Sequence, residues 1–332
     1  MSARRDARET VAALGAGRMG RGIATAFAYA GHEVLLIDVK ERPAAQAAEL
    51  ERAALAEIDT ALGAMSRWGA FDDALRPAIL QRVRFAARDQ APAALARADV
   101  VFEGVPEVID AKRDAFAFAS PHLRAGTLLA STTSTFLVTQ LAAFAPDPER
   151  FLNAHWLNPA HLIPLVELSA HPGTAKEASR AMTSLLERIG KVPVMCAPAP
   201  GYIVPRLQSL IMNEAARMIE QGVASAEDID RATRYGLGFR FANMGVVEFI
   251  DFGGNDILYY ASRYLASALG DERYASPAIV DRHMREARNG LRDGRGFYDF
   301  AGVDVATYRN ELLGRMLGML EHLGMARPPD PG

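Results

Sequence analysis

Cysteine is almost absent from this 332-residue chain, in which Cys196 is the single thiol. One cysteine excludes an intramolecular disulfide and is typical of a reducing compartment, so we expect a cytoplasmic protein. The sequence has no run of 18 apolar residues, which argues against a membrane-spanning helix. No apolar stretch follows the arginines of Met1–Thr10, so we interpret this segment as a frayed tail and not as a secretory signal.

An excess of charge of one sign is also missing. The 37 Lys and Arg residues nearly balance the 40 Asp and Glu residues, and no basic patch stands out. Nucleic-acid binding requires such a patch, so we expect a small-molecule substrate instead. The single cysteine and the scattered histidines give no zinc-ligand spacing such as H-E-x-x-H, and we expect no metal site. Ser134 does not lie in a G-x-S-x-G sequence, which disfavours a serine hydrolase.

The length of the chain points to two domains, because single hydrophobic cores stop growing at roughly 250 to 300 residues. Two prolines and a glycine interrupt the apolar periodicity at Pro198–Gly201. We therefore predict an α/β domain of the Rossmann type, with a mostly parallel sheet, at residues 8–198. An all-helical domain is expected at residues 199–332.

The first domain opens with a glycine-rich turn between a strand and a helix. The turn has the sequence G-A-G-R-M-G at residues 15–20. Gly15 suits a tight turn, Gly17 lets the backbone approach a pyrophosphate, and Gly20 allows the helix to pack closely against the strand. The N-terminus of the helix would face the phosphates. The pattern predicts a dinucleotide site, with Met19 also on the cofactor side.

An acidic residue closes the second strand. The run Glu33–Ile37 is followed by Asp38, eighteen residues after the last glycine of the turn. A carboxylate at this place can accept hydrogen bonds from both ribose hydroxyls and repels a 2′-phosphate, so NAD is the predicted cofactor. Lys40 is close enough in the sequence to weaken the preference for NAD over NADP.

Further candidates follow two later strands. The segment Asp99–Glu107 predicts a strand that ends at the cofactor edge of the sheet. Glu107 and Lys112 are candidates for the cofactor side, and a solvated charge at a helix start is the alternative for either. A strand at 127–130 runs into five hydroxyl residues, Ser131–Thr135, which could also be a turn with helix-capping side chains.

The centre of the chain holds a histidine and a carboxylate on two predicted strands. One strand ends in His155, and the next, Leu165–Leu168, carries Glu167, so adjacent strands would bring the two side chains together. Such a pair can accept a proton near neutral pH, as the oxidation of an alcohol requires. Ser134 and Asn158 can hydrogen-bond the same substrate oxygen. We expect this site in the cleft between the two domains.

Together these motifs resemble the L-3-hydroxyacyl-CoA dehydrogenase family over nearly the whole chain. The resemblance is carried by Val11–Asp38, Glu103–Glu107, Ala130–Ser134, His155–Pro159, Pro200–Ile203 and Gly294–Tyr298. It implies that His155 is the catalytic base and that Glu167, twelve residues later, is its partner. The implied reaction is the reversible, NAD-dependent oxidation of a short-chain L-3-hydroxyacyl-CoA, such as 3-hydroxybutyryl-CoA, in fatty acid metabolism.

The same resemblance assigns roles to the other candidates. Ser134 is implied to contact substrate and cofactor, and Asn158 to shape the substrate pocket. Glu107 and Lys112 are implied to lie near the nicotinamide ribose.

Two departures from the family leave the substrate open. Pro205 lies where the family usually has a substrate-binding asparagine, and the segment Ser66–Phe71 lacks the lysines expected near the CoA phosphates. The segment Gly236–Ala242 resembles the branch that acts on small free hydroxy acids, such as L-gulonate or carnitine. Arg240 would then clamp a carboxylate, unless it is a solvated arginine in a loop. A third possibility is a non-catalytic cofactor-binding or structural protein like lambda-crystallin, against which the intact histidine and glutamate argue.

The second domain has helical sequence. Apolar residues recur every three or four positions from Val204 to Met218, and Pro205 is tolerated in a first helical turn. Ser225–Asp228 predicts the capped start of the next helix. We predict a homodimer formed through this domain.

Overall fold

The computed structural model describes residues 8–329, so most of the segment interpreted as a frayed tail lies outside the described range. The chain divides into two compact units, the first ending at Met212 and the second beginning at Asn213. An α/β unit followed by a helical unit confirms the predicted fold class. The boundary predicted after residue 198 stays a prediction, and helix α8 (Val204–Glu220) runs across the end of the first unit.

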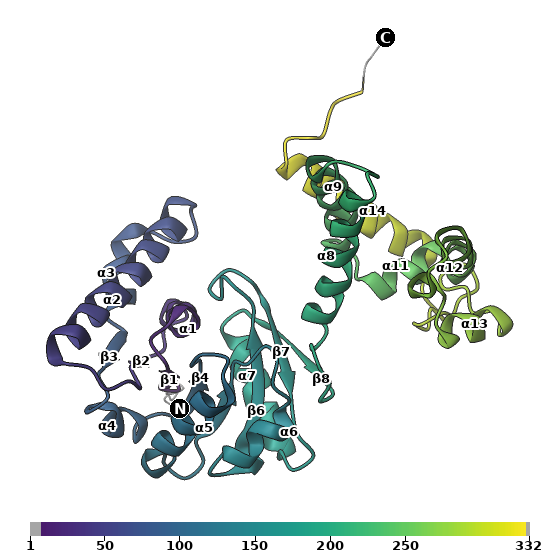
Figure 1. The fold of residues 1–332 in the computed structure, drawn as a ribbon. Coiled ribbons are helices and arrows are strands. Elements are labelled where there is room, and N and C mark those ends of the chain that lie inside the picture. Colours follow the sequence, from purple (N-terminus) through teal and green to yellow (C-terminus); the bar gives the residue numbers. More distant parts are fainter. Residues whose placement is uncertain (1–7, 330–332) are drawn as a thin grey trace, which may run out of the picture. The chain divides into compact units, whose positions relative to one another are not determined.

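The first unit is built on one eight-stranded sheet (Figure 1). Its strands are β1 (Val11–Leu14), β2 (Val34–Ile37), β3 (Val83–Ala86), β4 (Val100–Glu103), β5 (Leu128–Ser131), β6 (Phe151–Trp156), β7 (Leu165–Ser169) and β8 (Val192–Cys196). They lie in the order β3-β2-β1-β4-β5-β6-β7-β8, and every neighbouring pair is parallel except β6 and β7. Strand β1 lies between β2 and β4, which makes its carboxyl end the topological switch point where such sheets bind ligands.

Helices cover both faces of this sheet. They are α1 (Arg18–Tyr29), α2 (Ala44–Arg67), α3 (Arg76–Leu80), α4 (Ala91–Leu95), α5 (Ile109–Ala119), α6 (Val138–Leu141) and α7 (Lys176–Arg188). One buried apolar cluster contains Phe27 of α1 and Trp156, and the other contains Phe116 of α5 and Phe151. Burial on both faces explains why the central strands are continuous apolar runs and do not alternate with polar residues.

One predicted strand is shorter than its sequence indicates. The strand expected at residues 99–107 ends at Glu103, because the backbone leaves the sheet at Gly104. The amide of Val105 donates to the carboxylate of Glu103, and Pro106 has no N–H with which to continue a strand ladder. Glu107 therefore lies in the connection to α5 and not on the strand.

The second unit consists of helices. They are α9 (Ala226–Ala232), a π-helix (Thr233–Gly238), α10 (Phe239–Phe241), α11 (Val246–Gly253), α12 (Asn255–Leu269), α13 (Ala278–Arg285) and α14 (Val305–His322). The Ser225 hydroxyl accepts a hydrogen bond from the Asp228 amide at 3.1 Å, which confirms the predicted cap of α9. No described helix is both long and apolar enough to cross a membrane.

A buried carboxylate explains the glycine motif of this unit. Asp251 is 1% exposed and accepts hydrogen bonds from the amides of Phe297 and Tyr298. A Cβ atom added at Gly296 would lie 2.1 Å from an oxygen of Asp251, so only glycine allows this approach.

Candidate active site

His155 and Glu167 lie directly opposite each other on the antiparallel strands β6 and β7. The Nδ1 atom of His155 donates to Oε2 of Glu167 over 2.8 Å. Both side chains are buried, with Glu167 fully shielded from solvent. The prediction that adjacent strands bring the two residues together is confirmed.

The second oxygen of Glu167 holds the start of helix α8. Its Oε1 atom accepts hydrogen bonds from the backbone amides of Ile203 (2.9 Å) and Val204 (2.8 Å). The first amides of a helix have no intrahelical partner and carry partial positive charge, so they compensate a buried carboxylate. Pro205 follows in the first turn, where its missing N–H leaves no intrahelical bond unmade.

Tyr202 is a member of the site to which the sequence alone gave no role. Its ring stacks on the imidazole of His155, with ring centroids 4.9 Å apart. Its hydroxyl donates to the carbonyl of Thr133 at 3.0 Å and accepts from the Asn153 side chain at 2.9 Å. Burial raises the pKa of Tyr202, so the phenol is neutral.

The backbone of Tyr202 is also unusual. Its φ of 43° is rare outside glycine, and such backbone strain is found mainly where the surroundings impose it. The sequence signal was the Pro-Gly-Tyr segment, which does not reveal its stacking partner.

Glu107 organises the hydroxyl-rich loop after β5. Its Oε1 atom accepts from the hydroxyls of Thr133 and Thr135 and from the amides of Ser134 (3.0 Å) and Thr135 (2.9 Å). Burial alone would raise the pKa of Glu107, but these hydrogen bonds and the charge of Lys112 outweigh it and lower the pKa to about 2. Glu107 is therefore ionised at neutral pH and fixes the backbone that presents Ser134.

Lys112 lies beneath this loop and is only 1% exposed, so its interpretation as a solvated charge is wrong. Its Nζ atom contacts both oxygens of Glu103, at 3.0 and 3.1 Å, and Oε2 of Glu107 at 3.2 Å. Glu103 also accepts from the Ser131 hydroxyl at 2.5 Å. Charged side chains are buried only when paired, and this pairing explains how α5 carries a lysine on its inner face. The sequence signal for Glu103 was an acidic residue within the apolar run V-V-F-E.

The glycine turn has the geometry that a dinucleotide requires. Gly15 has a φ of 117°, and a Cβ atom added at Gly20 would lie 2.0 Å from the Gly15 carbonyl. Gly17, in contrast, faces open space. A cavity of about 350 Å³ is lined by this turn, by Asp38 and by Gly104–Pro106. These features fit a pyrophosphate at the N-terminus of α1.

The carboxylate of Asp38 closes the same cavity and already has partners. Oδ2 accepts from Nε of Arg42 at 2.6 Å, and Oδ1 accepts from the Lys40 amide at 3.2 Å. Arg42 was not a candidate from the sequence, because both residues lie in the connection between β2 and α2, where no periodicity predicts their contact.

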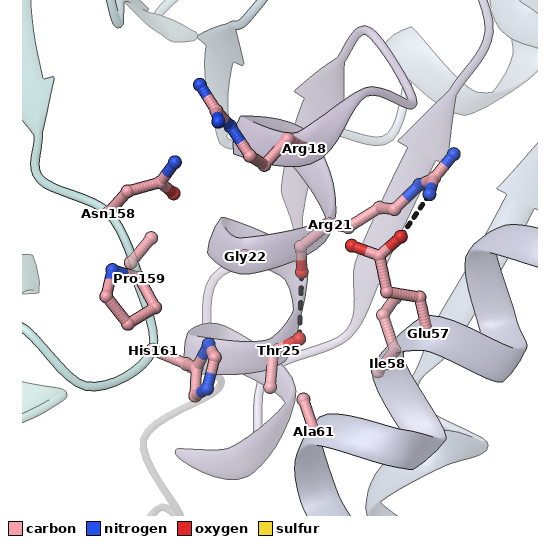
Figure 2. A pocket seen from close by; sticks show the side chains of 11 residues that line it. Arg18, Arg21, Gly22, Thr25, Glu57, Ile58, Ala61, Asn158, Pro159 and His161 are labelled. Atoms are coloured by element: carbon pink, nitrogen blue, oxygen red, sulfur yellow. Dashed lines mark hydrogen bonds and ion pairs between the residues drawn. The ribbon is translucent and has the colours of Figure 1, made fainter.

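Two of the predicted substrate residues lie outside strands β6 and β7. Asn158 is exposed and follows β6, at the edge of a cavity beside α1 (Figure 2). Arg240 belongs to the second unit and lies in the short helix α10 and not in a loop. Its guanidinium lies 4.6 Å from the ring centre of Phe249. Its role as a carboxylate clamp stays a prediction.

A glycine turn at a switch point, a carboxylate after β2 and a buried histidine–glutamate pair define a dinucleotide-dependent dehydrogenase. Comparison with known proteins gives the family. Residues 10–199 match the NAD binding domain of 3-hydroxyacyl-CoA dehydrogenase, and residues 201–300 match its C-terminal domain. The chain belongs to the 3-hydroxyacyl-CoA dehydrogenase family, as its motifs predicted. It is an NAD-dependent oxidoreductase that acts on a CH–OH group, and the predicted cofactor is confirmed.

Similar proteins span almost the full chain. A 5-formyl-3-hydroxy-2-methylpyridine 4-carboxylate 5-dehydrogenase from Mesorhizobium japonicum is 32% identical over 91% of this chain and 94% of its own. A 3-hydroxybutyryl-CoA dehydrogenase from Bradyrhizobium diazoefficiens is 31% identical over 90% of this chain and 98% of its own. The crystal structure of a 3-hydroxyacyl-CoA dehydrogenase from Archaeoglobus fulgidus is 30% identical. It covers 96% of this chain and 100% of its own, with a TM-score of 0.73.

Proposed function

We propose that this enzyme oxidises a short-chain L-3-hydroxyacyl-CoA, such as 3-hydroxybutyryl-CoA, to the 3-oxoacyl-CoA, with His155 as the base. The observation that carries the proposal is the buried hydrogen bond of 2.8 Å between His155 and Glu167. A role in fatty acid metabolism follows from that substrate. The reverse reduction uses the same residues.

The hydrogen bond to Glu167 determines which nitrogen acts. Because the carboxylate accepts the proton on Nδ1, the lone pair of the neutral imidazole is on Nε2. Nε2 takes the proton of the substrate hydroxyl, and the charge of Glu167 stabilises the imidazolium that forms. When bound, NAD supplies the nicotinamide ring, which accepts the hydride from the substrate carbon that bears this hydroxyl. Ser134, held by Glu107, and Asn158 hydrogen-bond the substrate oxygen.

A small free hydroxy acid is the alternative substrate. The Bradyrhizobium relative carries the name of a 3-hydroxybutyryl-CoA dehydrogenase, which supports the thioester. The Mesorhizobium relative is named for a pyridine carboxylate without CoA, which supports the alternative. Pro205 and the lysine-poor segment Ser66–Phe71 favour the free acid as well, whereas the frequency of acyl-CoA substrates in the family favours the thioester. The intact pair of His155 and Glu167 argues against a non-catalytic protein.

A substrate panel distinguishes these possibilities. NADH formation is measured with 3-hydroxybutyryl-CoA, free 3-hydroxybutyrate, L-gulonate and carnitine, and the panel is repeated with Arg240→Ala. Turnover of the thioester supports the proposal. If only free acids react and the variant loses them through a raised KM, the acyl-CoA assignment is wrong and Arg240 is the carboxylate clamp.

The proposed assembly is a homodimer in the cytoplasm. Large apolar side chains exposed on α8 support it, among them Leu210 at 64% and Met212 at 68% exposure. On α12, Tyr260 and Tyr264 are exposed in the same way. Contiguous exposed apolar surface is typical of interaction sites.

A further inference from the structure

A buried asparagine, Asn153, lies two residues before His155 on strand β6. Its side chain is only 1% exposed, and the reaction described above does not use it. Side chains two residues apart on a strand point to the same face of the sheet, and their positions differ by roughly 6 to 7 Å along the strand. Asn153 and His155 therefore share one face of β6 at a fixed spacing.

The amide nitrogen of Asn153 donates two hydrogen bonds. Its Nδ2 atom donates to the carbonyl of Phe136 at 3.0 Å and to the hydroxyl of Tyr202 at 2.9 Å. A backbone carbonyl can only accept, so it fixes which end of the amide faces Phe136. The Tyr202 hydroxyl, which accepts from Asn153, directs its own proton to the carbonyl of Thr133 at 3.0 Å. The direction of all three bonds is therefore defined.

These three bonds hold the loop after β5 by the carbonyls of Thr133 and Phe136, which lie on either side of Ser134. Glu107 holds the same loop by its hydroxyls and amides. The side chain of Ser134 takes part in none of these bonds and belongs to an exposed residue. The loop is thus held through its donors and its acceptors, and the Ser134 hydroxyl stays available to a substrate.

The other polar atom of the Asn153 side chain has no such function. Its Oδ1 atom is buried and has no hydrogen-bond partner among residues 8–329. A buried oxygen without a partner destabilises a fold, and an apolar side chain of similar size would avoid this loss. The two donated bonds, and not packing, therefore explain an asparagine at this position.

We propose that Asn153 is a positioning residue, which fixes the loop that presents Ser134 relative to the base His155. The inference rests on the proposed function, in which Ser134 and His155 act on the same substrate oxygen. A misplacement of about 1 Å can lower the rate of such a reaction about 100-fold, so the two groups need a rigid connection. Asn153 supplies it, because it shares β6 with His155 and donates to the loop both directly and through Tyr202.

Two substitutions of Asn153 test the donated bonds. Asn153→Asp keeps the shape but replaces the donor by an acceptor, which repels the Phe136 carbonyl and draws the Tyr202 proton away from Thr133. We expect kcat to fall about 10- to 100-fold with a nearly unchanged KM. Asn153→Ala removes the bonds without adding a charge and should lower kcat about 3- to 10-fold. Tyr202→Phe should lose less, because the bond between Asn153 and Phe136 remains. Initial rates with NAD and 3-hydroxybutyryl-CoA measure these effects.

Ser169→Ala is the matched control. Ser169 lies opposite Asn153 on β7 and is 3% exposed. Its hydroxyl forms no hydrogen bond with Tyr202 or with residues 133–136 of the described chain, so kcat should stay nearly unchanged. A fluorescence titration that gives the same number of NADH sites per chain shows that every variant is equally folded. A comparable loss of kcat in Ser169→Ala would overturn the assignment, because any polar deletion in this buried layer would then harm the enzyme.

A double-mutant cycle with Ser134→Ala separates positioning from general stability. If Asn153 acts through Ser134, Asn153→Ala lowers kcat about 3- to 10-fold in the wild type but less than about 2-fold in Ser134→Ala. A residue that only stabilises the fold lowers kcat by the same factor in both backgrounds. That result would overturn the proposal.

Hydrogen exchange of the NADH-saturated enzyme tests the same connection without a substrate. The amides of residues 133–136 should exchange faster in Asn153→Asp and Asn153→Ala than in the wild type, and at the wild-type rate in Ser169→Ala. If the thioester is not turned over, the kinetic tests use free 3-hydroxybutyrate, so the proposed substrate can fail while the Asn153 assignment holds. If neither compound reacts, the proposed function fails and the exchange rates decide. Faster exchange supports the role of Asn153 in holding the loop, and unchanged exchange overturns it.

Discussion

The imidazole of His155 lies nearly parallel to the phenol ring of Tyr202, with an angle of 16° between the ring planes. The face of an aromatic ring attracts a cation, so this arrangement favours the imidazolium that forms when His155 takes a proton. The hydroxyl of Tyr202 in turn bonds to Thr133 and Asn153, which fixes the ring between β6 and the loop after β5.

Substitution of Tyr202 separates stacking from hydrogen bonding. Tyr202→Leu removes the ring, and we expect kcat to fall about 3- to 10-fold, the loss expected for an aromatic or cation–π contact. Tyr202→Phe keeps the stack and should retain most of the kcat while losing stability, because the hydroxyl bonds are missing. Steady-state kinetics and thermal unfolding of both variants test this. Equal kcat in Tyr202→Leu and the wild type would show that the stack does not assist the reaction.

Removal of the base tests the central assignment. His155→Ala should lower kcat by about two to four orders of magnitude, the range for a lost general base. NADH binding should persist, because the glycine turn and Asp38 are unaffected. Steady-state turnover checks the loss of kcat, and a fluorescence titration with NADH checks that cofactor binding persists. Unchanged turnover in the variant would exclude His155 as the base.

Glu107 should make the free energy of unfolding depend on pH in the acidic range. Its pKa is about 2 in the folded protein, against 4.5 for an unperturbed glutamate carboxyl. A lowered pKa stabilises the fold above pH 4.5, and this contribution is lost as the pH falls from 4.5 towards 2. Urea unfolding of the wild type and of Glu107→Gln should therefore show a difference in the free energy of unfolding that shrinks across this range. A difference that is the same at about pH 6 and pH 3 would contradict the assignment.

Asp38 should determine the choice between NAD and NADP. Its carboxylate repels a 2′-phosphate and also holds Arg42 at 2.6 Å. Asp38→Ser removes the repulsion and releases Arg42, so we expect kcat/KM with NADP to rise roughly 10-fold or more and kcat/KM with NAD to fall. Arg42→Ala should not raise turnover with NADP. A wild type that prefers NADP would mean that Lys40 or Arg18 outweighs Asp38.

The predicted homodimer has a direct test in light scattering. A mass of about twice 35.9 kDa is expected at micromolar concentration. Replacement of exposed apolar residues such as Leu210 and Met212 by serine should shift the protein towards the monomer. A wild-type protein that stays monomeric at this concentration would contradict the predicted homodimer.

Sequence reasoning succeeded where the fold depends on local patterns. The glycine turn and the neighbouring strands of His155 and Glu167 follow from apolar runs and short connections. It failed where a residue's environment depends on distant partners. Lys112 has the sequence of a solvated helix residue, and only the position of Glu103 on β4 explains its burial. The stack of Tyr202 on His155 joins residues that are 47 positions apart, which no periodicity reveals.

The two oxygens of Glu167 serve different parts of the structure. One accepts a hydrogen bond from His155, and the other accepts hydrogen bonds from the first amides of α8. A related protein without catalytic activity would still need this carboxylate to hold the start of α8. A glutamate at this position therefore does not by itself indicate that a protein of this fold is active. His155 is the better marker of activity, because among the described residues its only polar contact is Glu167.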